Sequence, residues 1–547
     1  VNTNPFHTPY CVYSDKHRDG YWGKDCGKYF LNDLVLKHGF NVPPKGSEDR
    51  KIYDDNGDLV DAKTPPVVRL IAHNAAYDFR FLQKYLNGKI TSIERGTGLL
   101  TATAHYYYKG KVIYIELKDS LKMINMPLKK FGKSFKLDVE KEEVMPYDLY
   151  TEENVKKKYI PLKECLQAVN KAKLDEKIFI SNCEEWDCFE FVNDVKYVDI
   201  LKYAGEYCYL DCMTLKAGYQ SFKMMALEAL RLNIDDYISL ASMAHDYLVT
   251  EGCYDGVLQI SGVPRAFIQN CVVGGRTMTA ENLKYHILDL LSDFDGVSLY
   301  PSAMRRMAGF LKGRPKIIKE FQPEKYDGYF ICVKIKKINK RYKFPLASYK
   351  GDGVRVFTND LEGRVLYLDK TALEDLIKYQ QVEYEFINGY YYDEGFQPKI
   401  NEVIQHIFNQ RLKFKNEHNP IQMVFKECMN SSYGKSYMKP IDTIDDYIKV
   451  KDFDKFMDRN FNYIQEATLL ANEQYYKIKR KKPIDEHFNN VHVGVSILSM
   501  TKRIMNEVMC LAEDLDIKMY YTDTDSIHIE ADKIDLLSSE FQKIHKR

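Results

Sequence analysis

The alternation of apolar and polar positions late in the chain predicts a strand, a tight turn and a second strand. The first strand is predicted over Lys518-Met-Tyr-Tyr-Thr-Asp523, and the second includes Ser526-Ile-His-Ile-Glu530. Because side chains alternate across a strand, residues two apart share a face. Asp523 and Asp525 are therefore expected together at the edge of a hairpin, within reach of a hard cation. Taken alone, the two acids are more simply explained as turn formers.

Four other segments have readable patterns. Two apolar runs, Val67–Ala72 and Tyr285–Phe294, predict buried strands. Ser298–Met307 predicts a helix with a hydroxyl cap and an early proline. The stretch from Val365 to Phe386 predicts a strand, a helix and a strand. Asp295, between an apolar run and a helix, could hold a metal or simply occupy an ordinary turn.

Residues 401 to 437 predict a hairpin of two helices, Asn401–Lys415 and Ile421–Tyr437, because Asn419-Pro420 breaks the periodicity. On the second helix a cation, an amide and an aromatic recur at i, i+4 and i+7, on one face: Lys426, Asn430 and Tyr433. Such a row can grip a triphosphate and a base. By itself it is more often a solvated helix face.

Composition sets only loose limits on function. The chain has 547 residues and a net charge of +1, so binding of nucleic acid would need local basic patches. The basic run Lys477–Lys482 is more simply explained as a solvated loop. Some of the 42 tyrosines could stack on bases, although most are expected to be packing residues. No apolar run of about 18 residues and no signal peptide is visible, so no membrane partner is expected.

The 12 cysteines form no Cys-x-x-Cys pair. Their one cluster is spaced wrongly for a standard zinc module: Cys183, Cys188, Cys208 and Cys212. They predict reduced thiols in an intracellular protein, with cytoplasm, nucleus and mitochondrion not distinguished.

Three motifs follow one another along the chain: DxxSLYPS from Asp295, KxxxNSxYG from Lys426 and YxDTDS from Tyr521. Together they resemble motifs A, B and C of family B DNA polymerases. The likeness is closest to the protein-primed branch found in some phages, viruses, transposons and linear organellar plasmids.

The resemblance implies a multidomain mixed α/β fold, with an RNase H-like 3′–5′ exonuclease domain followed by a right-hand palm and fingers. It implies template-directed addition of deoxynucleotides to a primer 3′-hydroxyl by two-metal phosphoryl transfer. Asp295 and Asp525 would hold two Mg²⁺, or Mn²⁺ as an alternative, with help from the carbonyl of Gly296. Asp523 would be supporting rather than essential.

The resemblance also assigns the substrates. Tyr300 would lie under the sugar and exclude a ribose 2′-hydroxyl, while Tyr433 would pack on the nascent base pair. Arg411 and Lys415 match an RxxxK motif that, with Lys426 and Asn430, contacts the triphosphate. Four glycine and lysine positions are carried over as DNA contacts: Gly274, Gly275, Gly434 and Lys435. The two glycines at 274–275 match a YxGG linker whose tyrosine is replaced here by Val272.

Two further motifs resemble the proofreading exonuclease of the same family. The first holds Asn74, Tyr77 and Asp78, with Asp78 opening a helix, and the second holds Tyr207 and Asp211 at i and i+4 of a helix. The family also needs an earlier DxE motif, and nothing before Asn74 fits it. The exonuclease site is therefore expected to be incomplete, with only Asp78 and Asp211 as metal ligands and a chain that begins just after the DxE strand.

Protein priming rests on three residues between these motifs. Ser120, Leu121 and Lys141 match positions that bind single-stranded DNA and the priming protein in that branch. An exposed loop with surface lysines is the competing explanation. The expected partners are a DNA primer-template, deoxynucleoside triphosphates and a terminal priming protein.

Position along the chain suggests the following domains. An exonuclease-like domain covers 1–215, a linker 216–285, the palm 286–319 with 489–547, and the fingers 400–437. Two family-specific insertions cover 320–399 and 438–488; the second is associated with strand displacement and processivity. Three alternatives are a reverse transcriptase or RNA replicase, a stand-alone nuclease, and a binding protein without activity. The motif wording and the intact acids argue against all three.

Overall fold

The computed structural model describes residues 9–41, 51–53, 59–61, 66–95, 98–137, 144–351, 353–438, 442–470, 473–481 and 489–546. The chain divides into two compact units. The first unit is Val1–Ser239 with Ile441–Lys482, and the second unit is Leu240–Pro440 with Pro483–Arg547. None of the described helices is both long and apolar enough to span a membrane. No disulfide joins any of the twelve cysteines, all of which lie in the described ranges.

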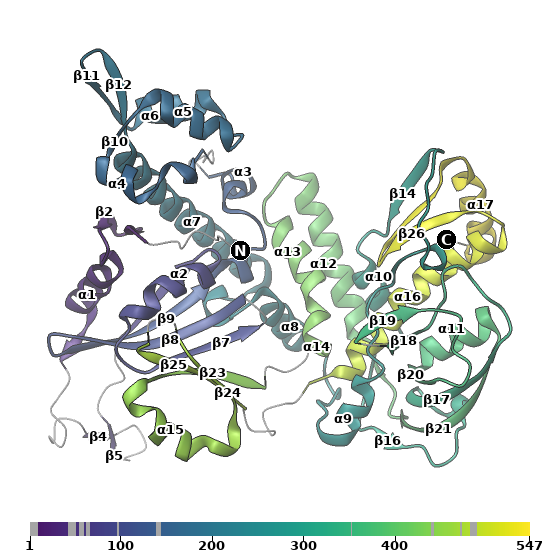
Figure 1. Ribbon diagram of the computed structural model, residues 1–547. Coiled ribbons are helices and arrows are strands. Elements are labelled where there is room, and N and C mark those ends of the chain that lie inside the picture. Colours follow the sequence, from purple (N-terminus) through teal and green to yellow (C-terminus); the bar gives the residue numbers. More distant parts are fainter. Residues whose placement is uncertain are drawn as a thin grey trace. The chain divides into compact units, whose positions relative to one another are not determined.

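The first unit is built on an eight-stranded sheet in the order β24-β25-β23-β7-β8-β9-β3, with β6 pairing in parallel with β9. Its strands are β3 (Phe40–Asn41), β6 (Val67–Ala72), β7 (Ile90–Arg95), β8 (Gly98–Tyr108), β9 (Lys111–Asp119), β23 (Thr443–Lys449), β24 (Ile464–Leu469) and β25 (Tyr475–Lys481). Figure 1 shows the late strands β23, β24 and β25, in light green, continuing the sheet of the early strands. Residues 441–482 therefore belong to the fold of the first unit.

Helices α1 (Cys26–His38) and α2 (Ala75–Leu82) pack on this sheet, and α15 (Phe453–Asn460) contacts β23. A long helix, α7 (Ile200–Leu230), follows a small subdomain with its own apolar core. The other elements of the unit are β1 (Cys11–Ser14), β2 (His17–Trp22), β4 (Lys51–Tyr53), β5 (Leu59–Asp61), α3 (Phe131–Phe135), α4 (Glu152–Lys157), β10 (Tyr159–Pro161), α5 (Leu162–Lys171), α6 (Glu176–Glu185), β11 (Phe189–Val192) and β12 (Val195–Asp199).

The second unit centres on α16 (Val491–Asp514), a 24-residue helix that packs on α9 (Gly262–Gln269), α10 (Leu299–Arg306) and α11 (Lys370–Gln380). Beside it lies a four-stranded sheet in the order β13-β26-β27-β14. Its strands are β13 (Thr277–Thr279), β14 (Leu291–Asp295), β26 (Met519–Asp523) and β27 (Ser526–Glu530), and α17 (Ile534–His545) follows them. The predicted strand-turn-strand around Asp525 is confirmed.

A second four-stranded sheet, in the order β16-β21-β17-β20, is formed by strands between residues 316 and 392. The predicted strand, helix and strand after residue 365 are confirmed as β20 (Val365–Asp369), α11 and β21 (Val382–Tyr392). The remaining strands of this region are β15 (Phe310–Leu311), β16 (Lys316–Ile317), β17 (Gly328–Ile338), β18 (Ser348–Gly351), β19 (Val354–Phe357) and β22 (Phe396–Gln397).

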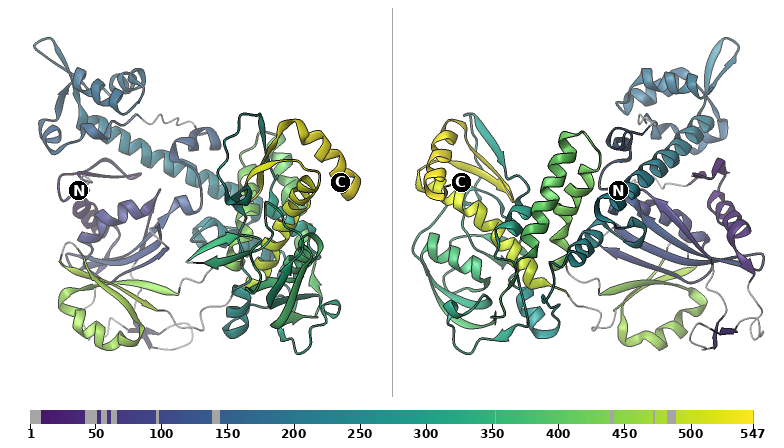
Figure 2. Two further views of the ribbon diagram at one scale, coloured as in Figure 1. Left: turned by 45° about the vertical axis from the view of Figure 1, so that its right-hand side comes forward. Right: turned by 180° about the vertical axis from the view of Figure 1, so that it is seen from behind.

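The predicted helical hairpin is confirmed. α12 (Lys399–Asn416) packs against α13 (Gln422–Ser432), and the two views of Figure 2 agree in showing them side by side. α14 (Gly434–Tyr437) follows, while Tyr433 between them keeps helical backbone angles. α8 (Leu240–Thr250) packs on α13. The rings of Phe414 and Phe425 stack 5.8 Å apart across the hairpin.

Two of the expected buried strands are less buried than predicted. The run expected from residue 285 is a strand only over β14, where Phe294 is 44% exposed, and Leu290 just before it is 81% exposed. β14 is the edge of its sheet and pairs only with β27, so its outer side stays open. β6 is a strand as expected and pairs with β9, yet Val67 at its start is 56% exposed.

The basic run at 477–482 was wrongly predicted as a loop, because residues 475–481 form β25 in the middle of three paired strands. Its cations have partners there. Lys477 Nζ lies 2.5 Å from Glu94 Oε2, and Arg480 pairs with Asp446. These side chains stabilise the first unit rather than forming a basic patch.

Candidate active site

The Asp523–Asp525 hairpin has a two-residue turn with Thr524 in the left-handed region at φ 59°. Asp523 ends β26, and Asp525 lies in the turn rather than in a strand. The alternation of a strand therefore does not explain why these acids are neighbours. The turn does, because the N–H of Asp525 donates to the carbonyl of Asp523 over 2.6 Å.

Asp295 reaches the same turn from the neighbouring strand. It ends β14 directly opposite Ser526, and the N–H of Gly296 donates to the carbonyl of Asp525 over 2.6 Å. Burial raises the pKa of Asp525, and the negative charges of Asp295 and Asp523 raise it further. A bound cation would relieve this repulsion between the carboxylates.

These residues fit Mg²⁺ bound together with a substrate. No group of three or more His, Cys, Asp or Glu side chains in the described ranges could enclose a metal. Mg²⁺ in phosphoryl-transfer sites is typically held by one or two carboxylates plus substrate phosphates, so Asp295 and Asp525 are a suitable protein contribution. Asp523 has a different partner, because its Oδ1 accepts a hydrogen bond from Thr277 Oγ1 at 2.8 Å.

A short segment before β13 braces the acid turn from the other side. The carbonyl of Arg276 accepts the N–H of Thr524 at 2.9 Å, and any side chain at Gly275 would collide with that of Thr524. The buried guanidinium of Arg276 donates to the carbonyls of Phe344 and Pro345 at 3.0 and 2.9 Å. Gly275 is therefore required here by packing, while Gly274 borders open space.

The rings of Tyr300 and Tyr433 lie face to face, with centroids 3.8 Å apart and planes 5° from parallel. Tyr300 is in the first turn of α10, and burial raises its pKa while the charge of Asp525 adds to the rise. The structure thus brings together the tyrosine predicted under the sugar and the one predicted on the base pair.

The cations of the α12–α13 hairpin occupy different environments. Arg411 is half-buried, and its Nη1 donates to the hydroxyl of Ser298 at 3.1 Å, which ties the hairpin to the start of α10. Lys415 and Asn430 are exposed. The Nζ of Lys426 lies 3.8 Å from Oε1 of Glu427. Ser298 takes φ 50° and caps no backbone group, so the predicted hydroxyl cap of α10 is wrong.

Gly434 and Lys435 begin α14. Burial lowers the pKa of Lys435, and burial with the charge of Lys435 lowers the pKa of His245 to about 4. Reasoning from sequence missed two residues that shape the site, Arg276 and Thr277, and it did not predict the bond of Ser298 to Arg411. No hydrophobic periodicity in the surrounding sequence marks these residues, because their role depends on neighbours far along the chain.

The exonuclease-like residues lie in the first unit. Asp78 is in the first turn of α2, and the protein atoms around its carboxyl raise its pKa to about 6, with a further contribution from Asp119. Tyr207 and Asp211 lie on α7, as predicted. Burial raises the pKa of Cys212 to about 12, and the charges of Cys208, Asp211 and Asp78 contribute to the rise.

The residues predicted to contact the priming protein are only partly described. Ser120 is 1% exposed; its hydroxyl donates to the carbonyl of Ala72 and contacts Nδ1 of His73, each at 3.0 Å. The N–H groups of Asn74 and Leu121 both donate to Asp119 Oδ1. Lys141 lies outside the described residues.

The charge repulsion at the acid turn predicts a pH-dependent effect on stability. A carboxyl with a raised folded pKa costs stability while ionised, and the cost fades as pH falls toward its unfolded pKa of about 3.9. Asp525→Asn should therefore raise the unfolding free energy of the protein in EDTA at pH 7. The gain should shrink by pH 4 in urea titrations followed by circular dichroism. A gain of equal size at both pH values would contradict the repulsion.

Comparison with known proteins gives consistent results. A family described as "DNA polymerase type B, organellar and viral" matches residues 63–528. A probable DNA polymerase of Ascobolus immersus is 24% identical over 484 residues, which are 85% of this chain and 38% of that protein. The chain thus spans well under half the length of that relative.

Solved structures of Phi29 DNA polymerase share the fold. The form complexed with single-stranded DNA has a TM-score of 0.56 and 18% identity, over 85% of this chain and 71% of that one. The form complexed with primer-template DNA and incoming nucleotides has a TM-score of 0.56 and 16% identity, over 85% and 72% of the two chains.

Proposed function

This chain belongs to the organellar and viral family of type B DNA polymerases, and from that premise we propose that it adds deoxynucleotides to a DNA 3′-hydroxyl under the direction of a template. The observation that carries the proposal is the pairing of Asp295 with the Asp525 turn across β14 and β27. An acid at the end of a strand and an acid in the neighbouring turn, brought to one point, suit in-line phosphoryl transfer.

Asp295 and Asp525 would hold the Mg²⁺ ions. When bound, these supply an acidified primer hydroxyl and charge stabilisation for the departing pyrophosphate. Asp523 supports the turn through Thr277. Arg411, Lys415 and Lys426 would bind the triphosphate oxygens with charge-assisted hydrogen bonds, together with the exposed Asn430, one turn after Lys426 on α13.

The stacked tyrosines suggest how the nucleotide is placed. The rings of Tyr300 and Tyr433 stack directly on one another, so an incoming base and sugar would separate or displace the pair. Tyr433 would then pack on the base pair and Tyr300 on the sugar. Gly274, Gly434 and Lys435 are proposed DNA contacts along the same surface.

Primer extension tests the proposal. The chain with a primed template, Mg²⁺ and the four deoxynucleotides should lengthen the primer by the templated sequence. The control omits one nucleotide and should stop extension at the first position that needs it. Extension that ignores the template, or degradation with no extension, would overturn the proposal.

The sugar assignment gives a second expectation. Tyr300→Val should admit ribonucleotides with little loss of deoxynucleotide use, because it removes a steric clash and no ligand. Single-nucleotide incorporation with matched ribo and deoxy substrates measures the ratio. Tyr300→Phe keeps the ring and should keep the discrimination. If Tyr300→Val discriminates as the wild type does, Tyr300 is not the gate.

We also propose that replication by the whole protein is protein-primed. The support is the match of Ser120 and Leu121 to the priming branch and the two segments inserted between the polymerase motifs. Ser120 would act by holding the carbonyl of Ala72 and the ring of His73 in place, because its own hydroxyl is buried. Filter-binding of a terminal protein to wild type and to Leu121→Ala would test this, and equal binding would contradict it.

Proofreading by these 547 residues should be weak. The exonuclease of this family needs a DxE pair of metal ligands besides Asp78 and Asp211, and nothing before Asn74 fits that motif. Degradation of a labelled single-stranded 3′ end should therefore be slow and unchanged in Asp78→Ala. Rapid Mg²⁺-dependent degradation that Asp78→Ala abolishes would refute the expectation.

A further inference from the structure

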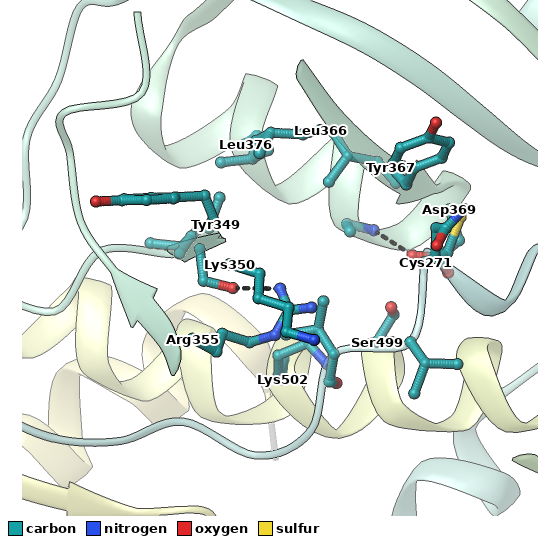
Figure 3. A pocket seen from close by; sticks show the side chains of 18 of the residues that line it. Cys271, Tyr349, Lys350, Arg355, Leu366, Tyr367, Asp369, Leu376, Ser499 and Lys502 are labelled. Carbon is teal, nitrogen blue, oxygen red and sulfur yellow. Dashed lines mark hydrogen bonds between the residues drawn. The ribbon is translucent and has the colours of Figure 1, made fainter. Parts of the chain in front are cut away.

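A cavity of about 770 Å³ opens in the second unit between α16, β20, α11 and the β18–β19 hairpin (Figure 3). Ligand sites typically have volumes of roughly 300–1,000 Å³. None of the residues that line the cavity is among those proposed for the polymerase site. The cavity is therefore a candidate ligand site separate from the polymerase site.

One side of the cavity is cationic. Its lining includes four basic side chains: Lys350, Arg355, Arg364 and Lys502. Within the described ranges their hydrogen bonds go to neutral oxygens. Arg355 Nη1 donates to Ser348 Oγ at 3.1 Å, and Lys502 Nζ donates to the carbonyls of Val273 and Leu498 at 2.6 and 2.9 Å.

Two acids line the same cavity but leave its charge positive. Asp375 is bound by Arg503 at 2.7 Å and by Asn506 at 3.0 Å. Asp369 is buried; it caps α11 by accepting the N–H of Ala372, and burial raises its pKa to about 6. Four cations thus face one available carboxyl, so an anion would be favoured.

The opposite side is apolar and aromatic. Figure 3 shows Leu366 and Leu376 across the cavity from Arg355 and Lys502, with Tyr349 at its flank. The guanidinium of Arg364 lies 3.6 Å from the centroid of the Tyr349 ring and holds that ring in position. An apolar wall with a fixed aromatic ring suits a flat heterocycle.

We propose that this cavity binds a nucleoside phosphate, with its phosphates on Lys350, Arg355 and Lys502 and its base against Tyr349 and Leu366. Guanidinium and ammonium groups bind phosphate oxygens through strong charge-assisted hydrogen bonds. The same chemistry is offered by a free nucleotide and by the 5′-phosphorylated end of a DNA strand, and these two sources are separated by the test.

Equilibrium binding to the full chain tests the site without relying on catalysis. The measurements use EDTA, no primer-template, and a Lys426→Ala background that weakens the proposed polymerase nucleotide contact. The probes are ribose-labelled fluorescent dATP, inorganic tripolyphosphate, and a labelled single-stranded hexanucleotide with or without a 5′-phosphate. The double variant Lys350→Ala with Arg355→Ala removes two exposed cations, so the fold should survive. Lys337→Ala, an exposed lysine on β17 outside the cavity, is the matched control.

The double variant should bind labelled dATP at least tenfold more weakly than the parent, while Lys337→Ala should bind as the parent does. Tyr349→Ala should weaken binding of dATP but not of tripolyphosphate. If the parent binds only the 5′-phosphorylated hexanucleotide and not dATP, and the double variant no longer binds that hexanucleotide, the occupant is a strand end. Equal binding of every probe by parent and double variant would overturn the site. Tripolyphosphate that binds as tightly as dATP would overturn the nucleoside part.

Discussion

Replacing Asp525 or Asp295 by asparagine should reduce single-nucleotide addition by a factor on the order of a thousand or more, while the protein still folds and binds primer-template. Asparagine keeps the size of the side chain and removes the charge that holds the cations. Loss of metal-assisted charge stabilisation is worth several kcal/mol, and each ~1.4 kcal/mol is a tenfold change in rate. Rapid-quench incorporation at saturating nucleotide measures the effect.

Asp293→Asn is the matched control, because Asp293 lies on the same strand two residues before Asp295. Its Oδ1 is 3.6 Å from His528 Nε2 and its side chain is exposed, so incorporation should stay within about twofold of the wild type. Asp523→Asn should lose less than Asp525→Asn, since Asp523 already bonds to Thr277. Near-normal extension by Asp295→Asn or Asp525→Asn in Mg²⁺ would contradict the assignment of these two acids.

Replacing Tyr447 by alanine should lower the unfolding free energy of the first unit by about 3–5 kcal/mol, the usual cost of removing a large buried aromatic. Tyr447 lies on β23, which pairs with β7 from the early part of the chain, and it is 5% exposed. Its ring packs near Phe79, and its hydroxyl donates to Glu94 Oε1 at 3.0 Å. The side chain thus joins the late strands to the core of the early ones.

The chain offers a clean readout for this change. Its only two tryptophans, Trp22 and Trp186, both lie in the first unit, so intrinsic fluorescence during urea unfolding follows that unit. Tyr463→Ala, in the same segment but 53% exposed, should change the unfolding free energy by less than about 0.5 kcal/mol. Tyr447→Phe should cost about 1 kcal/mol through the lost hydrogen bond. An unchanged midpoint in Tyr447→Ala would mean that residues 441–482 do not stabilise the first unit.

This coupling bears on the second predicted insertion. Tyr475, on β25, donates its hydroxyl to the carbonyl of Leu86 at 2.6 Å, and Lys477 pairs with Glu94. A deletion of residues 440–488 would therefore expose the β7 edge and part of the core together. Tests of strand displacement should use point variants on the exposed surface of this segment, such as Tyr463→Ala, so that stability and displacement are measured apart.

Local patterns in the chain were enough to predict several elements of the second unit. The β26–β27 hairpin, the helices α12 and α13 and the β20-α11-β21 unit are all confirmed. Each is specified by periodicity and by breakers such as Asn419-Pro420, which act over a few residues. The three motifs, in this order, then identified the family, because their residue types are the ones that the chemistry of such a site requires.

Tertiary structure alone decided how these elements are supported. The basic run at 477–482 was predicted as a loop, yet Lys477 meets Glu94 across 383 positions of sequence and lies in a strand. The hydrogen bond from the Thr524 N–H to the Arg276 carbonyl and the unpaired edge of β14 likewise depend on which distant strand packs alongside. Periodicity reports only which face of an element is apolar. Which partner covers that face is set by contacts between residues hundreds of positions apart, and no local pattern contains that information.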